Sequence, residues 1–251
     1  MLIVGFMGSP RPDGLTNGLL GRALAGAASA GAETRQVNLV DYDIRPWPRS
    51  TKSHDEELDR LASEADGLIL ASPVYYKDCT GLMRDFIDYL HNVPGVSAVS
   101  GKPGFGIALA GGSGMGQITA LRSLYGFFFF RGFRPLDPIP VSRFNYRAAL
   151  EEAYQRGAAL VEAARAPQSV AKLSDKLAHY YGLKYLDYDI VDELLLLCEQ
   201  MLGSAQVEEA ILAKWRTDYE RARELANNGD KMGAILPATA VYEALFHRRA
   251  P

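Results

Sequence analysis

The sequence predicts an α/β protein: a doubly wound parallel sheet of five strands, followed by an all-helical C-terminal extension. Two patterns lead to this prediction. Short apolar runs of strand length alternate five times with stretches of helical periodicity between residues 1 and 166, which is typical of parallel sheets covered by helices on both faces. Residues 170–251 show helical periodicity alone, after a proline-containing boundary at residues 167–169.

Five strand–helix pairs are expected along the first 166 residues. The first strand is predicted at residues 2–6, and the helix after it can end at Gly31 in the left-handed conformation. Residues 41–53 contain Pro46, Trp47 and Pro48 and predict a surface loop. The strands are expected at residues 2–6, 34–40, 66–71, 104–109 and 133–136, and the helices at residues 19–30, 54–65, 82–90, from about 117 to 130, and 148–164.

Charge and cysteine usage exclude several classes of protein. The 251 residues carry a net charge of -3, and the basic side chains are scattered, so we expect no nucleic-acid partner and no anionic membrane partner. No apolar stretch approaches the roughly 20 residues of a membrane span. We expect a cytoplasmic protein, because no signal peptide precedes the first strand. Cys79 and Cys198 are far apart, which predicts two free thiols and no thiolate metal site.

The loop after the first strand, GSPRPDGLTN at residues 8–17, is rich in groups that bind phosphate. Hydroxyls of Ser9 and Thr16, the amide of Asn17, the guanidinium of Arg11 and a helix N-terminus can all donate hydrogen bonds to a phosphate. The loop is neither G-x-G-x-x-G nor the Walker pattern, which disfavours nucleoside triphosphates. A terminal monophosphate fits better. The alternative is an ordinary strand-to-helix turn capped by a serine.

Two further unusual loops follow the third and fourth predicted strands. Residues 72–81 begin Ser-Pro-Val-Tyr-Tyr, and residues 110–117 contain four glycines. Ligands of open parallel sheets bind beyond the carboxyl ends of the strands, so we expect these two loops and residues 8–17 to share one rim. A tyrosine pair can stack on a flat ring, and glycines let the backbone approach it. The alternative for the tyrosines is packing in the core.

With these loops the sequence resembles the NADPH-dependent FMN reductase family of flavodoxin-like proteins. Residues 8–16 resemble its G-S-P-R-x-x-G-x-T loop, residues 65–88 its A-D-G, S-P-V-Y and F-I-D block, and residues 111–117 its glycine-rich flavin loop. The resemblance implies the flavodoxin-like strand order 2-1-3-4-5. Iron-sulfur flavoproteins are the nearest relatives by loop style, but this chain has RPWPR at residues 45–49 in place of their cluster cysteines. An iron-sulfur cluster is therefore not expected by that route.

The resemblance also implies a cofactor and its contacts. FMN would be bound, with NADPH or NADH as co-substrate, and no protein acid, base or metal is needed, because hydride passes between stacked rings. Arg11, Lys77 and Arg84 are candidates for the NADPH 2'-phosphate, although solvation at the surface explains Lys77 and Arg84 equally well. The phosphate would be held by Ser9, Arg11, Thr16 and Asn17, one edge and face of the ring by Pro73, Val74, Tyr75 and Tyr76, and the other side by Gly111, Gly112, Ser113 and Gly116.

The function implied is an NAD(P)H-dependent FMN reductase that passes electrons to a small acceptor, such as a flavin, a quinone or a dedicated metabolite. One alternative is a flavodoxin-like electron carrier that serves a protein partner, although a flavodoxin usually has a T-x-T-G-x-T loop and a strongly acidic surface. A weaker alternative is a degenerate family member that binds no flavin and serves as a scaffold. Cys79 lies in the second loop, which should pass near the ring, but a lone cysteine is more often a small buried apolar group than a redox centre.

The chain is expected to divide into a flavin domain, residues 1–166, and a helical extension, residues 167–251. Asp189 can cap a helix whose residues 194–197 are all leucine, which predicts burial on more than one side. Further helices are expected at residues 204–226 and 237–247. Two roles are open for the extension. It shapes a homo-oligomer, a dimer or tetramer, and covers the flavin site of a neighbouring subunit, or it stabilises the fold far from the site.

Overall fold

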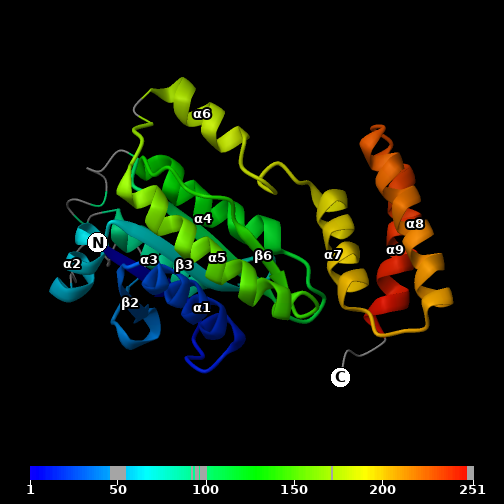
Figure 1. Ribbon diagram of the computed structural model, residues 1–251, viewed down its shortest axis with the longest axis horizontal. Helices are drawn as coiled ribbons and strands as arrows, with labels where there is room; N and C mark the ends of the chain where they lie inside the picture. Colours follow the sequence, from blue (N-terminus) through cyan, green and yellow to red (C-terminus); the bar gives the residue numbers. More distant parts are fainter. Residues whose placement is uncertain (46–54, 92, 94–95, 97–100, 171, 248–251) are drawn as a thin grey trace.

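The computed structural model describes residues 1–45, 55–91, 93, 96, 101–170 and 172–247. Most of the loop predicted at residues 41–53, including Trp47, lies outside the described residues. The chain forms a central sheet with helices on both faces and a group of helices at its C-terminal end (Figure 1). The predicted fold class is therefore confirmed.

Five parallel strands form the sheet in the order β2-β1-β3-β5-β6, which is 2-1-3-4-5 when they are counted along the chain, as expected. A short additional strand, β4, pairs antiparallel with the end of β3 and was not predicted from the sequence. The strands are β1 (Leu2–Met7), β2 (Glu33–Asn38), β3 (Gly67–Tyr75), β4 (Asp78–Cys79), β5 (Gly104–Ala110) and β6 (Ile139–Ser142).

The helices cover both faces of the sheet because β1 and its neighbours are apolar on both sides. Val4 and Phe6 pack with α2, α3 and α4, whereas Ile3 and Met7 pack with α1 and α5. Figure 1 shows helices on both faces of the sheet. The helices are α1 (Leu15–Ser29), α2 (Glu56–Glu64), α3 (Gly81–Leu90), α4 (Gln117–Arg131), α5 (Tyr146–Arg165), α6 (Leu173–Tyr181), α7 (Ile190–Ser204), α8 (Glu209–Asn227) and α9 (Lys231–Phe246), with a 3-10 turn, η1, at Leu39–Asp41.

The fifth strand was predicted at residues 133–136, and this position is wrong. The strand is β6, which starts at Ile139 and pairs in regular parallel register with β5. Upstream, the amides of Arg134 and Leu136 do donate to carbonyl groups at the start of β5. Pro135 and Pro138 have no amide hydrogen, so a continuous ladder cannot form there.

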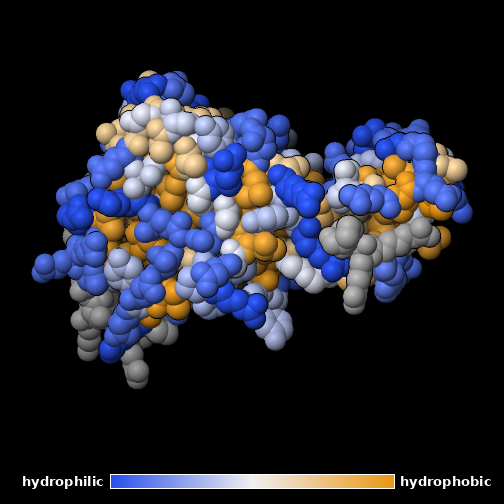
Figure 2. All heavy atoms as spheres, turned by 60° about the horizontal axis from the view of Figure 1, so that its bottom comes forward, coloured by the Kyte–Doolittle hydropathy of each residue, from blue (hydrophilic) through white to orange (hydrophobic). Residues whose placement is uncertain are grey.

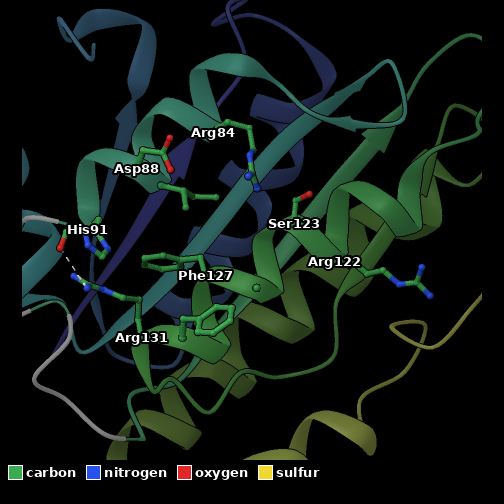
Figure 3. A pocket seen from close by; sticks show the side chains of 10 residues that line it. Arg84, Asp88, His91, Arg122, Ser123, Phe127 and Arg131 are labelled. Atoms are coloured by element: carbon green, nitrogen blue, oxygen red, sulfur yellow. Dashed lines mark hydrogen bonds between the residues drawn. The ribbon is translucent and has the colours of Figure 1, made fainter. Parts of the chain in front are cut away.

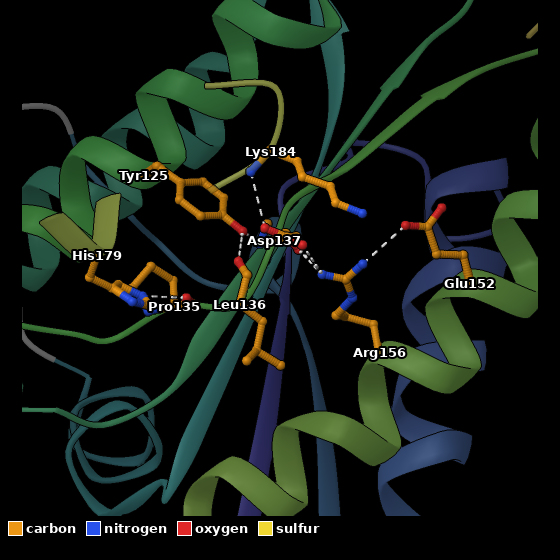
Figure 4. Close-up of polar contacts among 9 residues, drawn as sticks. Tyr125, Pro135, Leu136, Asp137, Glu152, Arg156, His179 and Lys184 are labelled. Atoms are coloured by element: carbon orange, nitrogen blue, oxygen red, sulfur yellow. Dashed lines mark hydrogen bonds and ion pairs between the residues drawn. The ribbon is translucent and has the colours of Figure 1, made fainter. Parts of the chain in front are cut away.

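Side chains from other elements form hydrogen bonds to the carbonyl groups of residues 135–137 (Figure 4). They fix residues 135–137 as a junction between the sheet, α4, α5, α6 and the chain after α6. His179 Nε2 lies 2.8 Å from the Pro135 carbonyl, the Tyr125 hydroxyl donates to Leu136 at 2.5 Å, and Arg156 donates to the Asp137 carbonyl at 2.7 Å.

The C-terminal helices fall into two groups. Helix α6 lies over α4, where the rings of Tyr180 and Phe129 are 5.0 Å apart, and it shares the core on that face of the sheet. Helices α7, α8 and α9 enclose a separate core around Leu197, Trp215 and Val241. They form a smaller body joined to the larger one by a narrower waist (Figure 2). The division at residue 166 stays a prediction, since α6 packs with the sheet.

Most helix boundaries differ from the expected ones by a few residues. Helix α1 begins at Leu15, four residues before the expected start, so Thr16 and Asn17 lie in its first turn. Helix α9 begins at Lys231 and includes Pro237, which the sequence had placed at its start. Within the described ranges, we find no helix that is long and apolar enough to span a membrane.

Candidate functional site

A cavity of about 560 Å³ opens at the carboxyl ends of β1, β3 and β5. Its volume is within the range of small-molecule sites, and all three unusual loops contribute to its wall. The loops therefore share one rim, as the sequence predicts. The lining residues are Ser9, Arg11, Gly14, Leu15, Thr16, Pro73, Val74, Tyr75, Tyr76, Lys77, Leu109, Ala110, Gly111, Gly112, Ser113 and Met115.

The first loop is anchored where it leaves β1. The Gly8 amide donates to the Ala71 carbonyl at 2.8 Å, and the Gly8 carbonyl accepts from the Thr80 hydroxyl at 2.5 Å. The same hydroxyl accepts from the Met83 amide and so caps α3. An added Cβ at Gly8 would lie 2.7 Å from the Met83 Cβ, so only glycine fits this close approach. The loop is thereby held against β3 and α3.

The rest of this loop presents hydrogen-bond donors to the cavity. The Ser9 hydroxyl accepts from the Arg11 amide and donates to the Arg11 carbonyl, both at 3.1 Å, which closes a short turn. Helix α1 then starts after Gly14, and no described side chain caps it. Its N-terminal amides carry partial positive charge beside the buried Thr16 and the exposed Arg11. This arrangement fits a phosphate group.

Asn17 is oriented differently from its expected phosphate contact. Its side-chain oxygen accepts a hydrogen bond from Gln36 on β2 at 2.5 Å, and Asn17 is not among the residues that line the cavity. The predicted contact between Asn17 and a phosphate therefore stays a prediction. Sequence reasoning could not see this competing partner, because Gln36 lies on the strand next to β1.

The second loop continues β3 to Tyr75 and turns back at once into β4. Residues Tyr76 and Lys77 form the two-residue connection, and both have left-handed φ angles, 51° and 66°. Left-handed backbone costs about 1 kcal/mol or more at a non-glycine residue, and such strain is concentrated at functional sites. Tyr76 is fully exposed and Tyr75 about half-exposed. Core packing of the tyrosines is thereby excluded, and their rings can meet a ligand.

The third loop contributes bare backbone to the cavity wall. An added Cβ at Gly111 or Gly112 would meet nothing within 4 Å, so open space faces both residues. Gly116 is not in the wall. Its φ of 96° is left-handed, and an added Cβ would lie 2.6 Å from the Lys77 Cα and 2.8 Å from Val74. Gly116 therefore allows the second and third loops to touch.

Cys79, in the second loop, has an unreactive thiol at neutral pH. Cys79 is 4% exposed, and burial raises the pKa of its thiol to about 12. The thiolate is the reactive form, so this side chain packs as an apolar group at neutral pH. No cluster of three or more histidine, cysteine, aspartate or glutamate side chains within the described residues could hold a metal ion.

A larger cavity, about 740 Å³, lies between α3 and α4 and contains none of the three loops (Figure 3). Arg84 and Asp88 of α3, with His91 just after it, line one side of this cavity, and Arg131 of α4 lies opposite His91. Arg122 of α4 also lines it, but its guanidinium points away and donates to the carbonyl groups of Leu186 and Tyr188. Arg131 donates to the Leu90 carbonyl at 2.6 Å. The structure thus separates Arg84 from Arg11 and Lys77, which line the loop cavity, so the three candidates for the 2'-phosphate do not form one group.

The sheet order and the cavity at its rim define the flavodoxin-like class of α/β proteins. Among solved structures, the apo form of NADH:FMN oxidoreductase (EMOB) aligns with 70% of this chain and 93% of its own, at a TM-score of 0.52 and 23% identity. A flavodoxin from the domain Archaea aligns with 66% of this chain and 99% of its own, at a TM-score of 0.50 and 19% identity. These two likenesses show the fold.

The sequence model of the NADPH-dependent FMN reductases matches residues 1–138, and the chain belongs to this family. It is therefore an NAD(P)H-dependent flavin enzyme with FMN as cofactor. An iron-sulfur flavoprotein of Methanocaldococcus jannaschii is 29% identical over 138 residues, which are 51% of this chain and 72% of that protein. The resemblance stated from the loops is confirmed. The family match ends before β6 and the C-terminal helices.

Sequence reasoning missed several residues of the cavity wall. Leu15, Leu109, Ala110 and Met115 line it but carry no chemistry that a motif would reveal. Their only signal is position, since each lies within three residues of a residue that was predicted. Lys77 was considered only for the nicotinamide nucleotide, and its place at the tip of a strained hairpin could not be foreseen from its type.

Proposed function

We propose that the protein oxidises NADPH or NADH and passes the electrons through FMN to a small acceptor, such as a free flavin, a quinone or a dedicated metabolite. The observation that supports this best is the cavity at which the three loops meet. One side offers helix amides and hydroxyls to a monophosphate, and the other offers bare glycine backbone and exposed tyrosines to a flat ring.

The predicted contact residues other than Asn17 have proposed roles in or beside this cavity. Arg11, Thr16 and the first amides of α1 hold the phosphate, and the Ser9 hydroxyl keeps the loop in the turn that presents them. Pro73, Val74, Tyr75 and Tyr76 form one wall of the ring site, and Gly111, Gly112 and Ser113 form the opposite wall. Gly116 holds the two walls together.

FMN supplies the hydride chemistry when it is bound, accepting two electrons from the nicotinamide and releasing them to the acceptor. The chain contributes binding and orientation, because rings that are stacked at the correct distance need no protein acid or base. The exposed edge of Tyr76 and the cation of Lys77 lie at the mouth of the cavity, where they can receive a second, charged substrate.

Anaerobic mixing of the FMN-loaded protein with NADPH and with NADH tests the proposal. We expect the flavin band near roughly 450 nm to bleach with at least one of them, and a small acceptor to restore it. If neither nucleotide bleaches the band, the protein is not a pyridine-nucleotide reductase. If the reduced protein is reoxidised by no small acceptor, the alternative of an electron carrier for a protein partner is favoured.

A cytoplasmic location and a homo-oligomeric state also belong to this proposal. Exposed apolar side chains on α6, Leu173, Leu177 and Tyr181, favour association with a second copy. Light scattering on the purified protein tests this part, and a monomer at micromolar concentration would contradict it.

A further inference from the structure

We propose that Glu193 of α7 is a positioning residue for the flavin ring, because it holds residues 111–116 from behind in the shape that receives the ring. This inference rests on the proposed function, since it assigns the C-terminal helices a role in the same cavity. The loop at residues 110–117 faces the cavity with one side and α7 with the other.

Glu193 is a buried carboxylate, 4% exposed, in a run of leucines. Its Oε1 accepts hydrogen bonds from the amides of Gly116 at 2.9 Å and Ile118 at 3.0 Å. These are the N-cap and second residues of α4, and Gly116 has no side chain with which to cap the helix itself. A carboxylate at a helix N-terminus is favourable, so α7 supplies the cap that α4 lacks.

Two neighbours on the same face of α7 complete the contact. Residues 193, 197 and 200 are spaced i, i+4 and i+7, which places them on one side of a helix. The Leu197 side chain packs closely on Gly114, because a Cβ added at Gly114 would lie only 2.7 Å from the Leu197 Cδ1. Gln200 and Gln117 exchange amide hydrogen bonds at 3.0 and 3.2 Å, and Gln117 also donates to the Gly114 carbonyl.

Helix α9 contacts the same loop at Ser113. The Tyr242 hydroxyl donates to the Ser113 carbonyl at 3.1 Å. The C-terminal helices thus contact residues 113, 114, 116 and 118, whereas Gly111 and Gly112 are left facing the open cavity. Because Gly116 also touches Lys77 and Val74, the position set by Glu193 is passed to the second loop of the ring site.

These contacts are made within one chain. They differ from both roles considered from the sequence, because the extension neither needs a neighbouring subunit to reach the loop nor lies far from it. An acceptor oxygen at Glu193 is the feature that the proposal requires, since loss of it leaves two buried amides unpaired behind the loop. The loop then relaxes, and its conformation must be restored when the ring binds.

A titration of apoprotein with FMN tests the proposal. It is carried out well below the melting temperature, and quenching of the flavin fluorescence reports binding. We expect Glu193→Ala to bind FMN about tenfold or more weakly, the scale of one unpaired buried group. Glu193→Gln keeps a carbonyl oxygen, and we expect its Kd to be within about threefold of the wild-type value. Glu199→Ala, an exposed carboxylate on the same helix, is the matched control and should leave the Kd unchanged.

The melting temperature of each apoprotein separates positioning from mere stability. A purely structural residue would lower the melting temperature and leave the Kd of the folded protein as it was, which would overturn the proposal. Equal weakening in Glu193→Gln and Glu193→Ala would also overturn it. If Glu193→Ala does not fold, Tyr242→Phe removes a single hydroxyl from the same contact, and we expect about two- to fivefold weaker binding. An unchanged Kd in that variant would then overturn it.

Failure of the proposed function gives a different result. If the wild-type protein binds no FMN, the cavity itself is wrongly assigned. If the wild-type protein binds FMN and bleaches with a reduced nicotinamide, while all the variants bind equally well, only the role of Glu193 is lost.

Discussion

Gly111 lies on the wall of the loop cavity with open space where a Cβ would be, and its φ is not left-handed. Alanine can therefore take its place without backbone strain, but its methyl group would occupy the space proposed for the ring. We expect Gly111→Ala to melt at nearly the wild-type temperature as apoprotein and to bind FMN about tenfold more weakly, as measured by fluorescence titration.

Gly21 provides the matched control for this change. It lies in α1, and an added Cβ would also meet nothing within 4 Å. Alanine is favoured over glycine inside a helix, so Gly21→Ala should stabilise the protein by about 0.5–1 kcal/mol and leave FMN binding as it is. Equal FMN affinity in the two variants would show that no ring lies against Gly111.

Cys79 gives a prediction of reactivity. Burial is the main cause that raises the pKa of its thiol to about 12, and Asp78 adds to the effect. The thiol is therefore protonated at neutral pH, and native protein should react with a thiol reagent far more slowly than unfolded protein does. Cys198 is buried too, with a pKa raised to about 12. Rapid labelling of one thiol in the native protein at pH 7 would contradict this.

Single residues of the site could be predicted where a motif couples residue type to a backbone position. Ser9, Arg11 and Thr16 follow a strand and precede a helix, and that local order alone brings them to the rim. The partners that decide what a side chain does are not local. The Asn17 side-chain oxygen accepts a hydrogen bond from Gln36, and the strand order alone does not show that these two side chains point toward each other.

Among the elements, the start of α7 makes a prediction about pH. Asp189 caps α7 and forms an ion pair with Lys231 of α9 at 2.7 Å. The hydrogen bond from Lys231 is the main cause that lowers the pKa of Asp189 from 3.8 to about 2. A lowered pKa stabilises the folded state above pH 4, and this contribution is lost as the pH falls through 2.

Lys231→Met should therefore destabilise the protein slightly at pH 7, by well under 1 kcal/mol because both groups are largely solvated. The difference from wild type should shrink as the pH falls from about 4 to about 2. Denaturant unfolding at several pH values measures it. A difference that stays constant down to pH 2 would show that Asp189 and Lys231 are not coupled.

The strands and helices show where sequence patterns fail. An apolar run predicts a strand, but residues 133–136 and 139–142 are both short, only partly apolar and interrupted by proline. Only the second pairs regularly, because Pro135 and Pro138 interrupt the ladder before it and side chains bond the carbonyl groups there. These side chains are Tyr125, His179 and Arg156. Those side chains come from three other helices. The prolines can be seen in the sequence, but these three partners cannot, so the apolar run alone placed the strand wrongly.

The whole molecule consists of a sheet with two cores and a helical body with a third core. The sequence predicted the sheet, its order and its functional rim, since these depend on alternation and on loop motifs. The contact between the sheet and the helical body could not be predicted from the sequence. Glu193 is an acidic residue in a leucine-rich helix, and its partner Gly116 is 77 positions away.

That contact makes the two bodies thermodynamically dependent on each other. If α7 holds the loop that receives the ring, then a ligand bound to the loop must in turn stabilise α7, because coupling between two sites is reciprocal. We expect FMN to slow amide hydrogen exchange in residues 190–204 as well as in residues 110–117. Helix α2, at residues 56–64, packs on the sheet away from the cavity and is the internal control.

The size of the effect distinguishes this coupling from general stabilisation. Ligand at a hundred times its Kd stabilises the folded state by about 2.7 kcal/mol, which slows exchange through global unfolding everywhere. Exchange through local opening, which is faster, should slow in α7 and not in α2. In Glu193→Ala, FMN should protect residues 110–117 and no longer protect α7. Protection of α7 that persists in this variant would mean that another contact, such as the Gln117–Gln200 pair, connects the two bodies.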